Sequence, residues 1–478
     1  MPILDRAQFA QSYTSGDCSI FLLQAILTHA VHYGPLPLLI EAGYSDRLVA
    51  AKTLYERARV LYDFGMEKSP LVVLQGCILL HGSYLAVKTE RDFRFWLETA
   101  TRVATQMGMH KEATHQSVDI AFRKVFRRIW SFLSYRDVLV SCAGLKHSRS
   151  IPDSCNVHDV TESDWEDEST LVQYSNIIPT VSRLQKLYFI ELVRLSKIGE
   201  HSHVLPRPIL LIDICAAALF LRLLNVPPDM RTDEAFQDLE TSLLRWRNCL
   251  PVELRLETIA EWSVDNVWIL FLRMDSYRYE GGFYRAWREF GRLSGDDSAF
   301  KTALRRQQNA MLEVDSVIDR LTLHELVHYC PVTAFTNAAV NLAMHIEISC
   351  NPATTDHQRQ IVHGHMRCDL WFLSRGTERW PYLQKMFGLL RKVLSQTKFS
   401  LDPLPHILGQ DPAMVSDSER HQYNTSPAQT DGQVAMFGNH SNDSPADALF
   451  NTFSGIALWD AAGDSIFEDQ VLFFPDLD

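Results

Sequence analysis

Apolar residues along most of this chain recur at the helical period. In the segment SIFLLQAILTHAVHY they stand three and four positions apart, which predicts the buried face of a helix, formed by Ile20, Leu23, Leu27, Ala30 and Val31. The segment at 50–65 repeats the pattern and stops at Gly65, a residue type that commonly ends helices. Alternation typical of strands is nearly absent. The pattern from about residue 18 to 397 therefore predicts an all-α, multi-helix domain.

Two further segments show how helices are expected to begin and pack. At 69–87, Ser69 is a candidate N-cap, Pro70 suits the first turn, and apolar residues on most faces suit a central helix. At 91–109, one helical stripe is apolar and consists of Phe93, Trp96, Leu97, Ala100, Val103, Ala104 and Met107. Both segments are predicted to contribute to one buried core.

A polar, acidic connector at about 144–171 interrupts the helical pattern. The apolar run at 208–224 contains charged residues and is short for a membrane span, so we interpret it as a buried helix. Helical patterns resume at 271–287 and at 301–329. Residues 1–400 are therefore predicted to form one helical domain around this connector.

The composition changes after about residue 400. Residues 401–440 are rich in Ser, Asp, Asn, Gln and Pro, which predicts a disordered linker. Residues 441–478 contain eight acidic residues and no Lys or Arg. Among these acids stand large apolar side chains, notably Phe450, Phe453, Trp459, Phe467, Leu472, Phe473, Phe474 and Leu477. Such alternation is typical of a disordered activation segment, whereas the alternative is a strap that docks on the helical core.

Charge and cysteine content narrow the class of protein. With 46 basic and 58 acidic residues the net charge is -12, which disfavours bulk electrostatic binding of nucleic acid. The nine cysteines include no CxxC pair, so we expect reduced thiols in an intracellular protein. The N-terminal residues lack the basic and apolar regions of a signal peptide. The composition therefore predicts a soluble intracellular protein that does not associate with membranes.

The pentapeptide HELVH at 324–328 matches a catalytic motif. Two histidines four apart, with a glutamate after the first, form the zinc-binding helix of metallopeptidases. Glu347 lies downstream at the spacing that one class of zinc aminopeptidases uses. However, Pro331 follows the second histidine closely and should end the helix, and no flanking motif of these enzymes is present. A zinc hydrolase is therefore only a distant alternative.

We interpret His324 and His328 as packing residues. Both continue an apolar stripe that consists of Val314, Val317 and Leu321. The sequence thus predicts no catalytic residue and no metal site, and His324, His328 and Glu347 are disfavoured as ligands.

Other enzyme signatures are also missing from the sequence. It contains no GxSxG and no GxxxxGK[ST], and no GxGxxG follows a predicted strand. The histidines of HGH at 363–365 have no third ligand nearby in the sequence, so surface histidines are the simpler interpretation. We expect that the protein is not an enzyme.

A basic run at 122–137, FRKVFRRIWSFLSYRD, could suggest a nucleic-acid-binding helix. Its apolar residues share one face, however, and consist of Val125, Ile129, Phe132 and Leu133, with Phe122 and Phe126 beside it. The run is therefore predicted to be a core helix with a solvated basic side.

Together with its neighbours, this run resembles a known family. The matching residues are Ala58, Leu61, Tyr62, Gly65, Gln75, Trp96, Ala100, Ala104, Gly108, His110, Arg127, Arg128, Trp130, Tyr135, Arg136, Asp137, Gly144, Ile151, Cys155 and Val157. They are similar to the regulatory (middle homology) domain of fungal-specific transcription factors, the zinc-cluster regulators, and most to the cutinase transcription factor branch. The resemblance is specific over residues 1–170 and general over 171–397.

The resemblance implies a nuclear regulator of RNA polymerase II target genes. Its tail would contact coactivators or the transcription machinery, and the helical domain could respond to a small-molecule inducer or form a homodimer. Family members bind DNA through a six-cysteine zinc cluster, and this chain contains no such cluster. We therefore expect no cofactor in this chain, with zinc only in a module upstream of it. The alternative is a truncated cofactor or ligand-sensing scaffold that does not bind DNA directly.

Overall fold

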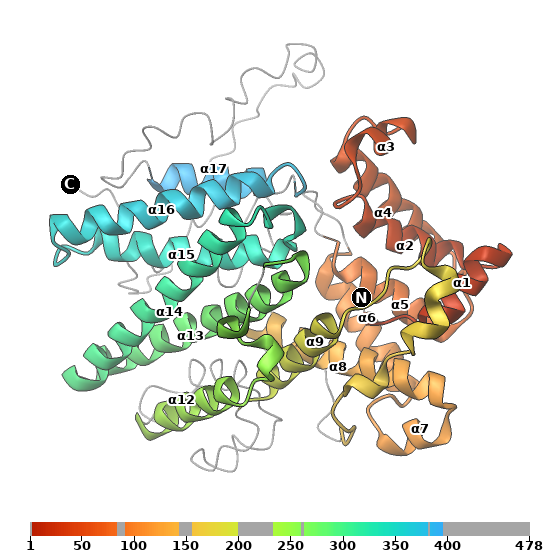
Figure 1. The fold of residues 1–478 in the computed structure, drawn as a ribbon, viewed down its shortest axis with the longest axis horizontal. Coiled ribbons are helices and arrows are strands. Elements are labelled where there is room, and N and C mark those ends of the chain that lie inside the picture. Colours follow the sequence, from red (N-terminus) through yellow and green to blue (C-terminus); the bar gives the residue numbers. More distant parts are fainter. Residues whose placement is uncertain are drawn as a thin grey trace, which may run out of the picture.

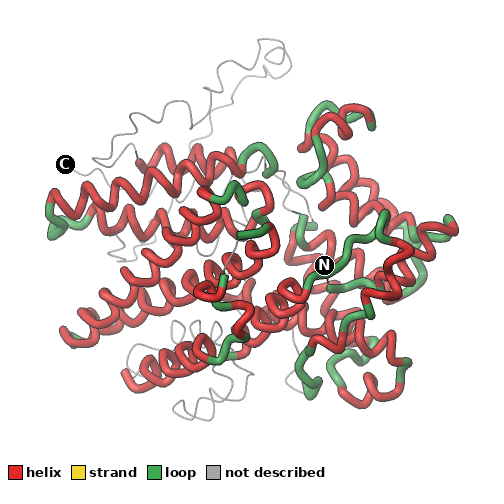
Figure 2. The backbone as a smooth tube through the Cα atoms, in the orientation of Figure 1, coloured by secondary structure: helices red, strands yellow, loops and turns green. Residues whose placement is uncertain are grey.

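Helices make up all the regular structure that the computed structural model describes. It describes residues 2–83, 91–142, 155–198, 233–259, 262–380 and 383–394. Within these ranges every regular element is a helix and none is a strand, which confirms the all-α fold (Figure 2). No helix of the described ranges is both long and apolar enough to cross a bilayer. The predicted helix at 208–224, the linker at 401–440 and the tail at 441–478 lie outside the described residues.

The first group of helices packs around one core and contains much of the family-like segment (Figure 1, red to orange). The group consists of α1 (Arg6–Ser15), α2 (Ile20–Ala30), α3 (Leu36–Glu41), α4 (Arg47–Asp63), α5 (Pro70–His81), α6 (Phe93–Gln106), α7 (Glu112–Ser117) and α8 (Ile120–Cys142). Trp96 lies at its centre, fully buried, and its indole donates a hydrogen bond to the hydroxyl of Tyr55 (3.0 Å). A tryptophan fits this interior because its only polar atom has a partner.

The second group of helices builds another large core (Figure 1, green to blue). The connecting helix is α9 (Arg183–Lys197). The helices that follow it are α12 (Asp233–Asn248), α13 (Val267–Ser294), α14 (Asp297–Leu323), α15 (Val332–Cys350), α16 (Asp356–Gly376) and α17 (Leu383–Leu394). The long helices α13 and α14 pack side by side, as do α15 and α16. Helix α9 contacts both α8 and α13, so it links the two groups.

Several helix ends lie where the sequence predicts them. Ser69 is the N-cap of α5, and Pro70 is its first residue. Gly65 follows the end of α4 with a φ of 56°, in the left-handed region that glycine adopts without strain. One helix, α1, was not predicted, and the side chain of Asp5 caps it by accepting a hydrogen bond from the amide of Gln8 (2.9 Å).

The predicted apolar face of α2 is wrong at three positions, whereas Val31, just after the helix, is buried as predicted. Ile20 is 64% exposed and Leu27 is 36% exposed, and Ala30 is exposed as well. The face toward α4 and α5 instead buries Phe21, Leu22, Ala25 and Thr28. Because apolar residues surround α2 on most sides, the residues that become buried are set by its neighbours rather than by its own pattern.

The two groups also touch directly at the end of α2. The ring of His32 stacks on that of Trp380, with centroids 4.2 Å apart, and His32 Nδ1 donates to the carbonyl of Arg379 (2.8 Å). Burial lowers the pKa of His32 to about 4, although the hydrogen bond to Arg379 opposes this shift. The imidazole is therefore neutral at pH 7, and the contact is uncharged.

Gly76 of α5 gives a direct test of packing in the first core. A Cβ at this position would lie 2.1 Å from Cε1 of Phe21, so neither side chain could keep its place. We expect Gly76→Ala to lower the free energy of unfolding by about 1–3 kcal/mol, which is typical of overpacking. Urea denaturation followed by circular dichroism measures this change.

Gly364 of α16 provides the matched control for Gly76. A Cβ there meets no atom within 4 Å, so Gly364→Ala should stabilise the helix by about 0.5–1 kcal/mol. Equal urea midpoints for Gly76→Ala and the unsubstituted protein would contradict the close packing of α2 against α5.

Candidate functional site

Arg128, on α8, lies at the centre of the family-like segment. Its side chain is only 1% exposed, and every guanidinium nitrogen donates a hydrogen bond. Nε and Nη2 donate to the carbonyls of Pro2 (2.8 Å) and Leu4 (2.7 Å). Nη1 donates to the carbonyl of Asp164 (2.7 Å), and Nη2 also reaches the carboxylate of Glu166 (2.8 Å). One side chain thus joins the first residues of the chain, α8 and the acidic connector.

The neighbouring arginine reinforces the same junction. Arg127 forms ion pairs with Asp164 (3.0 Å) and with Glu112 of α7 (3.2 Å). The prediction of a solvated basic side on this helix is therefore wrong at these two positions, because both guanidinium groups pair with carboxylates. Val125, Ile129 and Leu133 of the predicted apolar face are buried as expected. The helix is a structural element whose paired arginines are not available to phosphate groups.

The remaining motif residues of α8 are also buried. Trp130 donates from Nε1 to the sulfur of Cys155 (3.0 Å), which attaches the connector to α8 at a second point. Arg136 donates to Nε2 of His81 (2.8 Å), and Asp137 is fully buried. The motif residues of α8 are therefore buried or, at Arg127, partly buried, whereas Gly144 and Ile151 lie outside the described residues. The tail residues predicted to activate lie outside the described residues.

The HELVH segment does not continue α14: a turn at 324–325 leads into a short 3-10 helix (Val327–Tyr329), which corrects the predicted helix at 301–329. Helix α14 ends at Leu323, and Glu325 adopts a left-handed φ of 56°. The amide of Leu326 then donates to the carbonyl of Leu321 (2.8 Å), and both side chains are buried in the same core. This pattern is a Schellman motif, in which an apolar contact closes the end of the helix.

The two histidines of HELVH consequently do not share a helix face, and the packing interpretation is wrong for His328. His324 stacks on Trp262 with centroids 4.1 Å apart, whereas His328 is exposed. Glu347 pairs instead with Arg285 (3.3 Å) and with Arg288. The three residues of the zinc-protease pattern therefore have separate partners in the described structure.

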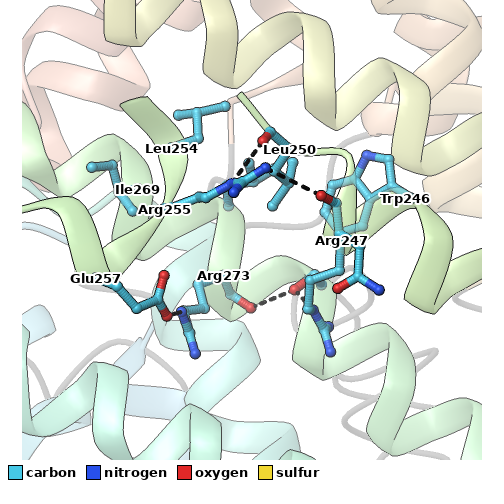
Figure 3. A pocket seen from close by; sticks show the side chains of 11 residues that line it. Trp246, Arg247, Leu250, Leu254, Arg255, Glu257, Ile269 and Arg273 are labelled. Carbon is cyan, nitrogen blue, oxygen red and sulfur yellow. Dashed lines mark hydrogen bonds and ion pairs between the residues drawn. The ribbon is translucent and has the colours of Figure 1, made fainter. Parts of the chain in front are cut away.

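A pocket of about 310 Å³ lies between the end of α12, the turns that follow it and α13. Figure 3 shows its lining side chains, with three arginines near its rim. The lining consists of Trp246, Arg247, Asn248, Leu250, Leu254, Arg255, Glu257, Ile269, Leu272, Arg273 and Ser276. The combination of apolar walls and a few polar groups is typical of a small-molecule site.

The arginines of this pocket differ in how fully they are neutralised. Arg247 pairs with Glu280 (2.5 Å), and Arg273 pairs with both Glu257 (3.4 Å) and Glu313 (3.3 Å). Burial raises the pKa of Glu280, and the charge of Arg247 opposes that rise. Among the described residues, the hydrogen bonds of Arg255 go only to backbone carbonyls, such as that of Leu250 (3.0 Å; Figure 3). Arg255 therefore presents positive charge at the pocket that an organic anion could neutralise.

No sequence pattern pointed to this pocket. Arg247 and Arg255 lie close together in sequence and could have marked a basic cluster. Arg273, however, comes from α13 and reaches the pocket only through the packing of α13 near the end of α12. The apolar walls come from both segments in the same way, so the pocket depends on tertiary structure.

Comparison with known proteins supports the resemblance seen in the sequence. The model of the "fungal specific transcription factor domain" family, which is not an enzyme family, matches residues 1–248. The fusaric acid cluster transcription factor of Gibberella fujikuroi is 27% identical over 441 residues, which cover 91% of this chain and 60% of that protein. The chain thus spans about three fifths of the length of this relative. No solved structure matches.

Two further relatives match a shorter part of the chain. Cutinase transcription factor 1 beta of Fusarium vanettenii is 29% identical over 184 residues, which cover 37% of this chain and 21% of that protein. The acetamidase regulatory protein of Aspergillus fumigatus is 29% identical over 184 residues, which cover 37% of this chain and 23% of that protein. The names of these two relatives describe a transcription factor and a regulatory protein.

Substitution of Arg128 tests its part in the fold. Arg128→Ala leaves buried carbonyls and the carboxylate of Glu166 without a partner, so we expect a loss of about 3–5 kcal/mol in the free energy of unfolding. Urea denaturation measures the loss of stability. Cleavage of residues 155–182 by a protease is the second measurement, and it detects release of the connector.

Arg183 supplies the matched control for Arg128. Its ion pairs with Glu162 and Glu253 are on the surface, where its side chain is 60% exposed, so Arg183→Ala should change stability little. Similar urea midpoints for the two variants would contradict the central position of Arg128.

Proposed function

Because the chain belongs to the fungal-specific transcription factor domain family, we propose that it is the regulatory and activating part of a nuclear transcription regulator of RNA polymerase II target genes. The observation that carries this proposal is the family match over residues 1–248, in one chain with the acidic, aromatic segment at 441–478. The names of the relatives, which include transcription factors for a fusaric acid cluster and for cutinase, support the same class of function.

In this proposal, the tail at 441–478 activates and the helical body restrains it. Repulsion among the acids keeps their apolar neighbours available, so that a coactivator with a basic-rimmed apolar groove can bind them. The helical body, held together by buried arginine contacts, provides a rigid surface that can limit access to the tail. Residues 401–440 would link the two parts.

The zinc cluster of the wider class does not enter the proposal. That cluster needs six closely spaced cysteines, whereas the cysteines here contain no CxxC pair. The residues present therefore do not fit a cluster of this kind, and no step of the proposal depends on DNA binding by them.

The arginine-rimmed pocket is the proposed site for a small-molecule inducer. It offers about 310 Å³ with apolar walls, which suits a small organic molecule. Arg255 near its rim, whose hydrogen bonds among the described residues go to backbone carbonyls, favours a carboxylate or another anionic group. Binding there would join the end of α12 to α13, next to the helices that connect the two cores.

A fusion of residues 441–478 to a heterologous DNA-binding domain tests activation. In a yeast reporter strain we expect strong expression from this fusion and weaker expression when the whole chain is fused instead. Replacement of the large apolar tail residues by Ala should abolish reporter expression. These residues are Phe450, Phe453, Trp459, Phe467, Leu472, Phe473, Phe474 and Leu477. Immunoblots would confirm equal amounts of each fusion.

Polar residues of the tail provide the control for this reporter. Asn451→Ala with Gln470→Ala changes the same segment but leaves its acids and aromatic side chains in place, so activity should persist. A silent reporter with residues 441–478 alone would refute the activating role. Equal output from the tail and the whole chain would refute restraint by the helical body.

Charge reversal at Arg255 tests the inducer pocket. Arg255 is exposed, so Arg255→Glu should fold normally but repel an anionic ligand. Under growth conditions that raise reporter output from the whole-chain fusion, we expect the variant to remain at its basal level. Arg245→Glu makes the same change on an exposed residue of α12 outside the pocket and should respond normally. Full induction of Arg255→Glu would exclude an anionic ligand at this pocket.

A further inference from the structure

Three helices of the second group bring pairs of polar side chains together, and all of these side chains except Asp319 are partly or fully buried. In each helix the two side chains are four residues apart, so they share a face. The pairs are Asp315 and Asp319 on α14, Asn341 and His345 on α15, and His365 and Asp369 on α16. This cluster is separate from the arginine-rimmed pocket and from HELVH.

Asp315 stands between the two imidazoles of the cluster. His345 Nε2 lies 3.1 Å from one oxygen of its carboxylate, and His365 Nδ1 lies 2.9 Å from the other. The two rings are nearly parallel, at an angle of 5°, with centroids 5.3 Å apart. One ligand atom from each of the three residues can be chosen so that all lie within 4.8 Å of one another.

Asp369 adds a second, independent observation. Its side chain is completely buried, and among the described residues only the amide side chain of Asn341 favours its charged form. Burial raises the pKa of Asp369 well above its usual value, and the nearby carboxylates of Asp315 and Asp319 raise it further, which places Asp369 at the same cluster. An ionised carboxylate without a cationic partner is strongly unfavourable in an interior, and repulsion from two more acids adds to the cost. A bound cation would offset both effects.

We propose that Asp315, His345 and His365 bind a divalent transition-metal cation, with Asp369 beside them to balance its charge. Two imidazoles and a carboxylate suit Zn²⁺ and similar ions, whereas Ca²⁺ and Mg²⁺ prefer sites made only of oxygen atoms. Ligand atoms around a tetrahedral zinc ion are separated by roughly 3.3 Å, given bonds of about 2.0 Å. The distances from Asp315 to the two histidines are close to this value.

One of the three proposed ligands reaches the surface. The side chain of His365 is 30% exposed, whereas those of His345 and Asp315 are 3% and 7% exposed. An ion can therefore bind His365 first and then reach the buried ligands. Because the ligands come from α14, α15 and α16, the ion would fasten these three helices together. This proposal does not depend on the inducer pocket or on the tail.

Metal binding to the full chain tests the proposal, with Zn²⁺ as the probe. Protein stripped of metal with a chelator is titrated calorimetrically, and affinity is measured by competition with a chromophoric chelator. We expect one tight equivalent of Zn²⁺ and a higher melting temperature in its presence. Asp315→Asn and His365→Gln should each weaken this equivalent by at least about 100-fold, because loss of even an outer-shell partner costs about 10- to 100-fold.

The histidines of HELVH provide the matched control. A His324→Gln, His328→Gln double variant removes two imidazoles that lie outside the cluster, the same number as the cluster contains. It should bind Zn²⁺ as the unsubstituted chain does. Absence of a tight equivalent in the unsubstituted chain would overturn the proposal. So would tight binding that persists in His365→Gln.

Chemical modification of the unsubstituted chain keeps the test valid if a variant fails to fold. Diethyl pyrocarbonate modifies accessible histidines, and peptide mass spectrometry locates the products. Zn²⁺ should protect the half-exposed His365 and leave the exposed His328 as reactive as before. Equal reactivity of His365 with and without Zn²⁺ would overturn the proposal.

Discussion

The buried guanidinium of Arg128 is the interaction on which the first half of the structure depends. It satisfies the carbonyls of Pro2 and Leu4, which no helix or sheet would otherwise pair. It also binds the backbone of Asp164 and the carboxylate of Glu166, so that an acidic connector can lie against a core. A fixed, planar group with donors in several directions suits this position, and a lysine could not replace it.

The helices of this fold follow from local pattern, but their orientation does not. The start of α5 after Ser69 and the stop at Gly65 lie where the sequence predicts them, because the fixed φ of Pro70 and the left-handed φ of Gly65 are local properties of the backbone. The buried face of α2 depends instead on contacts with other helices, and Ile20 is exposed although its spacing suggests burial. HELVH shows a similar limit, because Leu326 turns into the core and ends α14 before the predicted stop.

The candidate sites were predictable only as far as each lies within one helix. Arg127 and Arg128 could be singled out by their place in the family motif, but their carboxylate partners lie in the connector. The four-residue spacing of His365 and Asp369 is visible in the sequence, yet HGH suggested only surface histidines. Asp315 comes from another helix, and convergence of this kind depends on tertiary packing.

Buried charge distinguishes rigid from adaptable contacts in this molecule. Arg128 and its partners accept only one arrangement, because any shift would leave an unpaired charge in the interior. The contact of His32 with Trp380 is different, since it consists of one neutral hydrogen bond and two stacked rings. Breaking it exposes no charge and costs much less. A change in the relation between the two helix groups would therefore begin at such neutral contacts and leave the arginine junction intact.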